Sequence, residues 1–294
     1  MSTVKNYLSL VKFSHTIFAM PFALIGFVLG IAALKNNNIA LQTNEVILRF
    51  CLVLVCMITA RSAAMGFNRY LDRHFDQLNP RTAIREIPAG IIKAENALGF
   101  VVVNALIFIV ATYFINPICF YLSPVALFVI LFYSYTKRFT YLCHLVLGVG
   151  LSLAPIGAYL AVTGSFDILP LLFSFAIIFW VSGFDIIYAL QDAEFDAAQS
   201  LYSMPSHWGG DKALKIARVF HFFSGVFLWT AYFLGDFHWL YLIGVILFNS
   251  MLVYQQSIVK PNDLSKVNLA FMTANGIASI VFSIFVIAAI ILNF

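Results

Sequence analysis

The stretch VILRFCLVLVCMITARSAAMGFNRYLDRHFDQ, residues 46–77, decides the fold. Its first part, residues 46–67, carries almost no charge, whereas residues 68–77 hold two aspartates, two arginines and a histidine. A transmembrane helix requires about 20 mainly apolar residues. The stretch therefore predicts a membrane-spanning helix that ends in a group of ionisable side chains.

The composition of the whole chain agrees with a membrane protein. Of the 294 residues, 62% are hydrophobic and only 10% are charged, and the mean hydropathy is +0.93. These values lie far outside the range of soluble globular domains. A transmembrane barrel would need strands that alternate apolar and polar residues, and the apolar runs lack that alternation. We therefore expect an all-α integral membrane protein.

Apolar segments long enough to cross a bilayer occur nine times in this chain. They lie at residues 14–34, 45–67, 97–115, 118–135, 143–162, 168–190, 214–234, 238–255 and 269–293. The first segment reaches Lys35 without a small-residue cleavage site, so we expect an uncleaved helix and not a signal peptide. The four cysteines show no CxxC spacing, which favours small packing residues over a zinc site or a disulfide framework.

The basic residues predict the orientation. With nine crossings, fifteen of the seventeen Lys and Arg residues share the side of the N-terminus, and only Lys35 and Arg49 lie opposite. The positive-inside rule then places the N-terminus in the cytoplasm and the C-terminus outside. The positive charges surround helix ends and form no nucleic-acid face. No feature of the sequence indicates an obligate protein partner.

One face of the helix in residues 46–77 is polar. At 100° per residue, Arg61, Asn68, Asp72 and Asp76 share a face at the cytoplasmic end. Such a face is costly in lipid. We expect it to line a polar cavity inside the bundle.

The chain repeats this aspartate pattern further along. DRHFD at 72–76 matches DAEFD at 192–196, each at the cytoplasmic end of a long apolar helix. In the second copy, Asp185, Asp192 and Asp196 form one helical stripe with Tyr188 beside it. A single motif of this kind is commonly a solvated helix end, but two copies at the same depth favour a site.

The repeat predicts the architecture of a single domain, residues 1–294. Two pseudo-repeated halves, about 14–135 and 143–255, and a last helix, 269–293, would surround a central polar cavity. Carboxylates that converge there repel one another unless cations bind between them, and carboxylate oxygens favour Mg²⁺. Nearby basic residues are candidate partners for diphosphate oxygens. They are Arg81, Arg85, Lys137 and Arg138.

These motifs together resemble those of a known protein family. The sequence resembles the UbiA superfamily of intramembrane aromatic prenyltransferases over nearly its whole length. The resemblance is carried by Asn68-x3-Asp72-x3-Asp76, NPRTAIREIPAG at 79–90, YTKRFT at 135–140, and Tyr188-x3-Asp192-x3-Asp196. HTIFAMPFAL, NPRTAIREIPAG and QDAEFD are most similar to bacterial 4-hydroxybenzoate polyprenyltransferase-like enzymes of quinone biosynthesis.

The resemblance implies two Mg²⁺ ions, a polyprenyl diphosphate whose tail leaves toward lipid, and the bacterial inner membrane as the location. Asn68, Asp72 and Asp76 would hold one Mg²⁺ ion against the diphosphate, and Asp192 and Asp196 would hold the other. Arg61, Lys137 and Arg138 would touch diphosphate or acceptor. Many relatives carry a lysine where Tyr202 and Ser203 stand here, which leaves Ser203 as a hydrogen-bond donor at that position.

The chemistry expected of such a site is alkylation of an aromatic ring. Metal and basic side chains stabilise the leaving diphosphate, and a dry aromatic wall shelters the allylic cation. The ring proton then needs a base, for which Asp185, Asp192 and the departing pyrophosphate are all candidates. The acceptor is a hydroxybenzoate, a naphthoate or a ring of the futalosine-type route, and the prenyl length is open.

A second class of function fits some of the same features. Internal repeats with intramembrane carboxylates also occur in ion-coupled transporters. The carboxylates here lie near one membrane face and not at the midplane, and nine helices form no obvious inverted pair. A purely structural subunit gives no reason for two DxxFD motifs. We therefore expect an enzyme, with transport as the alternative.

Overall fold

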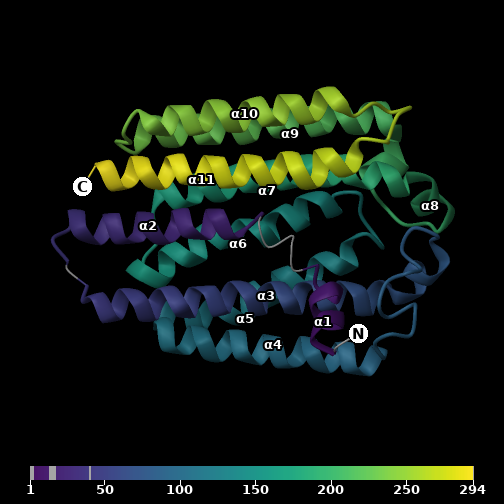
Figure 1. Ribbon diagram of the computed structural model, residues 1–294, viewed down its shortest axis with the longest axis horizontal. Helices are drawn as coiled ribbons and strands as arrows, with labels where there is room; N and C mark the ends of the chain where they lie inside the picture. Colours follow the sequence, from purple (N-terminus) through teal and green to yellow (C-terminus); the bar gives the residue numbers. More distant parts are fainter. Residues whose placement is uncertain (1–2, 13–17, 40, 294) are drawn as a thin grey trace.

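The protein is an elongated bundle of long helices in a computed structural model that describes residues 3–12, 18–39 and 41–293 (Figure 1). The predicted first segment, 14–34, therefore begins outside the described residues. The helices are α1 (Thr3–Leu10), α2 (Met20–Asn36), α3 (Thr43–Leu78), α4 (Ala94–Ile115), α5 (Pro117–Thr136), α6 (Cys143–Thr163), α7 (Ile168–Ala189), η2 (Leu190–Asp192), α8 (Ala193–Ala198), α9 (Met204–Leu234), α10 (Leu240–Ile258), η3 (Leu269–Ala274) and α11 (Asn275–Leu292).

By length and composition, eight helices in the described part of the chain could cross a membrane. The remaining apolar helix of the described residues, α2, has 17 residues, fewer than the roughly 20 of a typical span. The all-helical membrane fold is thus confirmed, whereas a ninth crossing by α2 stays a prediction. So does the orientation of the two ends.

Two predicted segments differ from the helices found. α3 continues to Leu78, well past residue 67, because its last turns are polar and carry no hydropathy signal. α9 begins at Met204, where residue 214 was predicted, and Gly209 interrupts it with φ 77° and ψ 163°. In both cases the helix extends beyond its apolar part.

Local sequence explains several helix ends. Asn116 caps α5 by accepting a hydrogen bond from the Cys119 amide, and Pro117 occupies the first helical turn. Ser203 caps α9 in a capping box with Ser206. Gly164 ends α6 in the left-handed conformation, with φ 67°, which favours glycine.

Close helix packing depends on glycine at a few positions. On α2, a Cβ at Gly26 would lie 2.0 Å from the Pro155 carbonyl oxygen of α6, and a Cβ at Gly30 would lie 2.7 Å from the Val162 Cβ. This GxxxG spacing is the usual means by which two membrane helices approach closely. It holds α2 against α6.

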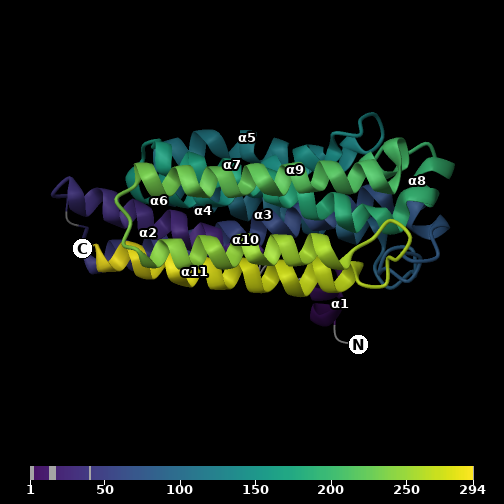
Figure 2. The ribbon, with the colours of Figure 1, turned by 90° about the horizontal axis from the view of Figure 1, so that it is seen from above.

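The largest buried cluster joins α2, α7, α9, α10 and α11. Its centre is aromatic, with Trp180, Phe22 and Phe282 almost fully buried. The Trp180 indole N–H donates to the Asn275 side-chain oxygen at 2.9 Å, which satisfies its polar atom inside the core. Seen from above, α10 and α11 lie side by side on this part of the bundle (Figure 2).

The polar connections gather at one end of the molecule. The loop of residues 79–93 and the short helix α8 lie together there, opposite the end that holds the C-terminus (Figures 1 and 2). α3 delivers Asp72 and Asp76 to this end, and η2 and α8 deliver Asp192 and Asp196. The fold therefore brings the two aspartate motifs to the same end of the bundle.

Candidate active site

A single large cavity contains side chains from both motifs. Its volume is about 790 Å³. Of the predicted site residues, all except Arg138 and Ser203 are part of its lining: Arg61, Asn68, Asp72, Asp76, Lys137, Asp185, Tyr188, Asp192 and Asp196. The sequence prediction thus selected residues that the fold brings together.

The first motif is held by two basic side chains. Arg138 Nη2 lies 2.8 Å from Asp72 Oδ1, and Asn68 donates to Asp72 Oδ2 at 3.0 Å. Arg85 Nη1 lies 2.5 Å from Asp76 Oδ1. The second carboxylate oxygen of Asp76 is buried and has no hydrogen-bond partner among the described residues. The motif therefore offers a free oxygen to a cation.

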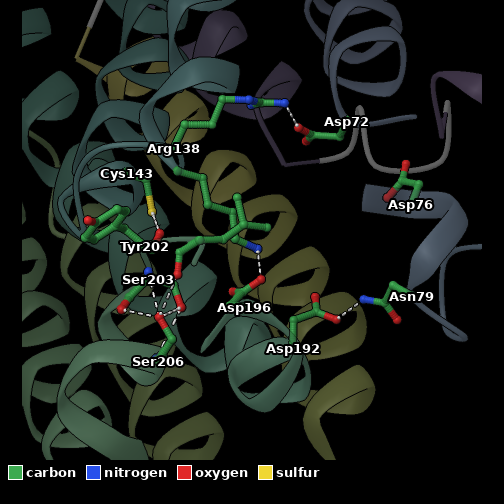
Figure 3. Close-up of polar contacts among 12 residues, drawn as sticks. Asp72, Asp76, Asn79, Arg138, Cys143, Asp192, Asp196, Tyr202, Ser203 and Ser206 are labelled. Atoms are coloured by element: carbon green, nitrogen blue, oxygen red, sulfur yellow. Dashed lines mark hydrogen bonds and ion pairs between the residues drawn. The ribbon is translucent and has the colours of Figure 1, made fainter. Parts of the chain in front are cut away.

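Arg81 holds the second motif. Its Nε donates to Asp192 Oδ1 at 2.9 Å, its Nη2 contacts Asp192 Oδ2, and its Nη1 donates to the Tyr188 hydroxyl at 3.0 Å. Asn79 adds a hydrogen bond to Asp192 at 3.1 Å (Figure 3). Burial is the largest single effect and lowers the pKa of Arg81, but the hydrogen bonds and charges of Asp192 and Tyr188 together raise that pKa above its usual value. Arg81 thus stays charged in the site.

Lys137 and Arg138 connect the two motifs. Lys137 Nζ lies 2.7 Å from Asp196, while its neighbour Arg138 pairs with Asp72 of the other motif (Figure 3). Burial is the largest single effect and lowers the pKa of Lys137, but the charge and hydrogen bond of Asp196, together with the charge of Asp192 and its other neighbours, raise that pKa above its usual value. The α5–α6 loop thereby places one positive charge at each motif.

The predicted stripe of Asp185, Asp192 and Asp196 is not a continuous α-helical face. α7 ends at Ala189 and a 3₁₀ turn, Leu190–Asp192, precedes α8. The 3₁₀ turn winds more tightly than an α-helix, so it changes the direction of the residues after it. Asp185 has its own partner: His144 Nδ1 lies 2.7 Å from Asp185 Oδ2.

Ser203 is not part of the cavity wall. It is fully buried, and its hydroxyl accepts a hydrogen bond from the Ser206 amide as the cap of α9 (Figure 3). Its neighbour Tyr202 donates its backbone N–H to the Lys137 carbonyl oxygen at 2.7 Å. Because the Ser203 hydroxyl caps a helix, a direct contact between Ser203 and a substrate stays a prediction.

Several lining residues were missed by sequence reasoning. Asn79 lies inside the quoted NPRT segment but had no assigned role. Arg69 was counted as a topogenic charge, yet it lines the cavity and is only 7% exposed. His144 belongs to no motif of the sequence, and Tyr133 is one of its 13 tyrosines. The position of Arg69, seven residues before Asp76, puts both on nearly the same helix face and could have identified it.

Arg61 and Arg69 differ from the other cations of the site. Each has a buried Nε without a hydrogen-bond partner among the described residues. Within the described residues, Arg61 makes one hydrogen bond, a long one of 3.4 Å to the Lys12 carbonyl oxygen. Both guanidinium groups lie within electrostatic range of Tyr133. These two cations therefore remain available for an anion.

Away from the charges, the cavity wall is apolar. Along α5, the whole cavity lining extends from the C-cap residue Lys137 at the charged end to Cys119, about 27 Å at 1.5 Å per residue. Side chains such as Phe108, Ile115 and Leu153 surround its apolar part. We call this part the apolar arm. The whole lining is nearly as long as the roughly 30 Å hydrocarbon core of a bilayer.

Carboxylates paired in this way are compatible with Mg²⁺. In the part of the chain that the structure describes, no three His, Cys, Asp or Glu side chains group closely enough to hold a metal alone. Protein Mg²⁺ sites typically use one or two carboxylates and complete their coordination with water and substrate phosphates. Each motif supplies two carboxylates, and the buried free oxygen of Asp76 supports the fit.

Comparison with known proteins gives a consistent result. The sequence profile described as the UbiA prenyltransferase family matches residues 18–277. A relative named 4-hydroxybenzoate octaprenyltransferase, from Tolumonas auensis, is 31% identical over 229 residues, which cover 76% of this chain and 78% of the relative.

Solved structures share the fold. The apo structure of a UbiA homologue from Aeropyrum pernix K1 has a TM-score of 0.78 and 25% identity, and the match covers 95% of this chain and 98% of that one. A UbiA homologue from Archaeoglobus fulgidus bound to DMAPP and Mg²⁺ has a TM-score of 0.70 and 20% identity, with coverage of 97% and 99%.

Proposed function

Because this chain belongs to the UbiA prenyltransferase family, we propose that it transfers a polyprenyl group from a polyprenyl diphosphate to an aromatic acceptor with the help of Mg²⁺. One observation carries the proposal: two aspartate motifs and their basic partners lie at one end of a cavity whose remainder is apolar. A diphosphate attached to a long hydrocarbon has the same division between charged and apolar parts.

Two Mg²⁺ ions would be held by the motifs, one by Asn68, Asp72 and Asp76 and the other by Asp192 and Asp196. The metal supplies charge neutralisation of the leaving diphosphate. The donor set of carboxylate and amide oxygens supports this choice. The Archaeoglobus fulgidus homologue, which shares the fold, is described as bound to Mg²⁺ together with DMAPP.

The basic residues would bind diphosphate oxygens directly. Arg81, Arg85, Lys137 and Arg138 each face a carboxylate in the ligand-free protein. An incoming diphosphate offers these cations new oxygen partners. Guanidinium groups suit this exchange because their planar fork matches phosphate as well as carboxylate. The ion pairs thus hold the donors in place before the substrate arrives.

The apolar arm would take the prenyl chain. Its wall excludes water from the allylic cation left when diphosphate departs. Gly157 of α6 lies on this wall, and a Cβ there would have no atom within 4 Å. The arm is therefore open at this position, which supports a long and flexible tail within the bundle.

The acceptor would carry an anionic group as well as an electron-rich ring. Arg61, which is half-buried, and Arg69, which is buried, supply two cations that form no ion pair with a described carboxylate, and Tyr133 lies beside them. An aromatic carboxylate such as 4-hydroxybenzoate has the matching charge. The relative from Tolumonas auensis carries the name of that acceptor. Naphthoates and carboxylated rings of the futalosine-type route fit the same description.

The reaction would belong to respiratory quinone biosynthesis at the bacterial inner membrane. Nine crossings, with α2 as the shortest, would put the N-terminus and the aspartate motifs on the cytoplasmic side and the C-terminus outside. The concentration of basic residues at the motif end supports this orientation. Both substrates would then enter a site close to the inner face of the membrane.

An acceptor panel tests this function. Membranes that contain the protein would be incubated with Mg²⁺, a labelled polyprenyl diphosphate, and hydroxybenzoate or naphthoate acceptors, and lipid products identified by mass spectrometry. We expect one prenylated acceptor that is absent from membranes without the protein. Intact diphosphate with every acceptor, from protein shown to be folded, would contradict the proposal and leave ion-coupled transport as the function to test.

A further inference from the structure

Asp185 differs from the other four carboxylates of the site. Asp72, Asp76, Asp192 and Asp196 each pair with an arginine or a lysine. Asp185 faces His144 instead, and no other described side chain bonds to it. It lies on the cavity wall, whereas His144 is only 2% exposed.

The hydrogen bonds of His144 determine its tautomer. The Met204 amide donates to His144 Nε2 at 3.2 Å, so that nitrogen is an acceptor and carries no proton. The proton is then on Nδ1, from which it is donated to Asp185 Oδ2 at 2.7 Å. Met204 is the first residue of α9, where a backbone N–H lacks a partner within the helix. A second ring proton on Nε2 would clash with the Met204 N–H that points at it, so this geometry keeps the imidazole neutral and fixed at both nitrogens.

A neutral donor affects a carboxylate differently from a cation. A carboxylate that faces a fixed positive charge is a weak base, because protonation would leave that charge uncompensated. A carboxylate held by one neutral N–H keeps its negative charge and a second oxygen free to accept a proton. Among the five carboxylates, only Asp185 has this environment in the described structure.

We propose that His144 is a positioning residue that holds Asp185 as the acceptor of the ring proton. This inference rests on the proposed function. Once the prenyl carbon has bonded to the ring, the C–H bond at that ring carbon breaks and its electron pair restores aromaticity. The proton passes to the free oxygen of Asp185 and later to water. The diphosphate leaves with the electron pair of the broken C–O bond, so no oxidant or reductant is needed.

A kinetic isotope effect tests this role. The acceptor would carry deuterium at the ring carbon that becomes prenylated, and kcat would be compared with that for the unlabelled acceptor. In His144→Phe we expect kcat to fall about 10-fold or more, with donor KM unchanged and an isotope effect larger than that of the wild type, because proton removal becomes slow. His144→Asn retains a neutral N–H donor and should recover part of the rate.

Controls separate this role from a structural one. His207→Phe makes the same change at an exposed histidine outside the cavity and should leave kcat and the isotope effect unchanged. If His144→Phe does not fold, the isosteric Asp185→Asn gives the same test.

Wild-type kcat in His144→Phe or Asp185→Asn, or a lower kcat without a larger isotope effect, would overturn the inference. That result beside an active wild-type enzyme would leave the proposed function intact. Absence of product from the wild type would count against the function itself.

Discussion

Arg81 donates from Nε and Nη2 to the two carboxylate oxygens of Asp192, a residue 111 positions further along the chain. Arg81 belongs to the loop after the first aspartate motif, and Asp192 begins the second. The contact therefore joins the two halves of the charged site before any substrate binds. Arg81 makes three side-chain hydrogen bonds in the site, and two of them go to this one carboxylate.

Substitution of Arg81 tests the importance of this contact. Arg81→Ala is expected to lower kcat about 10²- to 10³-fold, the loss typical when one preorganised donor is removed from a reacting anion. The kcat of Arg81→Lys should lie between those of the wild type and Arg81→Ala, because lysine keeps the positive charge but lacks the planar guanidinium group. Turnover of the purified protein gives the measurement.

Arg73→Ala is the matched control for Arg81. Arg73 donates to the Tyr70 carbonyl oxygen and lies outside the cavity lining. The Arg73→Ala variant should therefore keep the turnover of the wild type. Equal turnover of Arg81→Ala and Arg73→Ala would contradict a role for Arg81 in binding diphosphate.

Arg69 tests the proposed acceptor. Arg69→Met removes a buried cation and keeps the volume, so KM for a carboxylated acceptor should rise about 10- to 100-fold, as expected for one charge-assisted hydrogen bond. Donor KM should not change. The two KM values are measured in parallel. A rise in donor KM with no change in acceptor KM would assign Arg69 to the diphosphate instead.

Gly157 tests the apolar arm. Gly157→Phe puts a ring into open space on the cavity wall, so it should obstruct a long prenyl chain but spare a short one. We expect kcat/KM for a long-chain diphosphate to fall about 10-fold, the usual effect of a steric clash of 1–3 kcal/mol, with little change for a short-chain donor. Equal losses for both donors would refute this path for the tail. Gly99→Phe, on the outer surface of α4, is the control.

Gly26 tests the packing of α2. In Gly26→Ala the new Cβ would clash with the Pro155 carbonyl oxygen at 2.0 Å, and α2 would have to move away from α6. We expect the free energy of unfolding to fall by about 1–3 kcal/mol. Gly99→Ala adds a methyl group in open space and should not destabilise, because alanine favours helix. Thermal unfolding in detergent compares the two, and equal melting temperatures would show that α2 does not depend on this contact.

Sequence patterns predicted most of the long helices and most of the charged residues that line the cavity, for physical reasons. Hydropathy identified the spans because lipid requires continuous apolar helices, and the repeated DxxFD identified both motifs. The polar ends of α3 and α9 were missed because helix outside lipid has no hydropathy signal. The 3₁₀ turn before α8 was missed because spacing arguments assumed an unbroken α-helix.

Partner choice within the site could not be predicted. Which cation faces which carboxylate depends mostly on the three-dimensional arrangement of segments distant in the chain, such as Arg138 with Asp72, 66 residues apart. The environment of Asp185 could not be predicted either, because His144 belongs to no sequence motif and is held by a hydrogen bond from the Met204 backbone amide. Ser203 looked like a free hydroxyl until the start of α9 showed its capping role.

The most direct test of the central claim is the Mg²⁺ dependence of prenyl transfer by the wild type, Asp72→Asn and Asp192→Asn. The purified proteins would be assayed with a polyprenyl diphosphate and the acceptor from the panel, with Mg²⁺ and then with excess chelator. We predict product from the wild type only with Mg²⁺, and no product from either variant although both fold. Wild-type activity in chelator, or full turnover by either variant, would contradict a metal-assisted reaction between the two motifs.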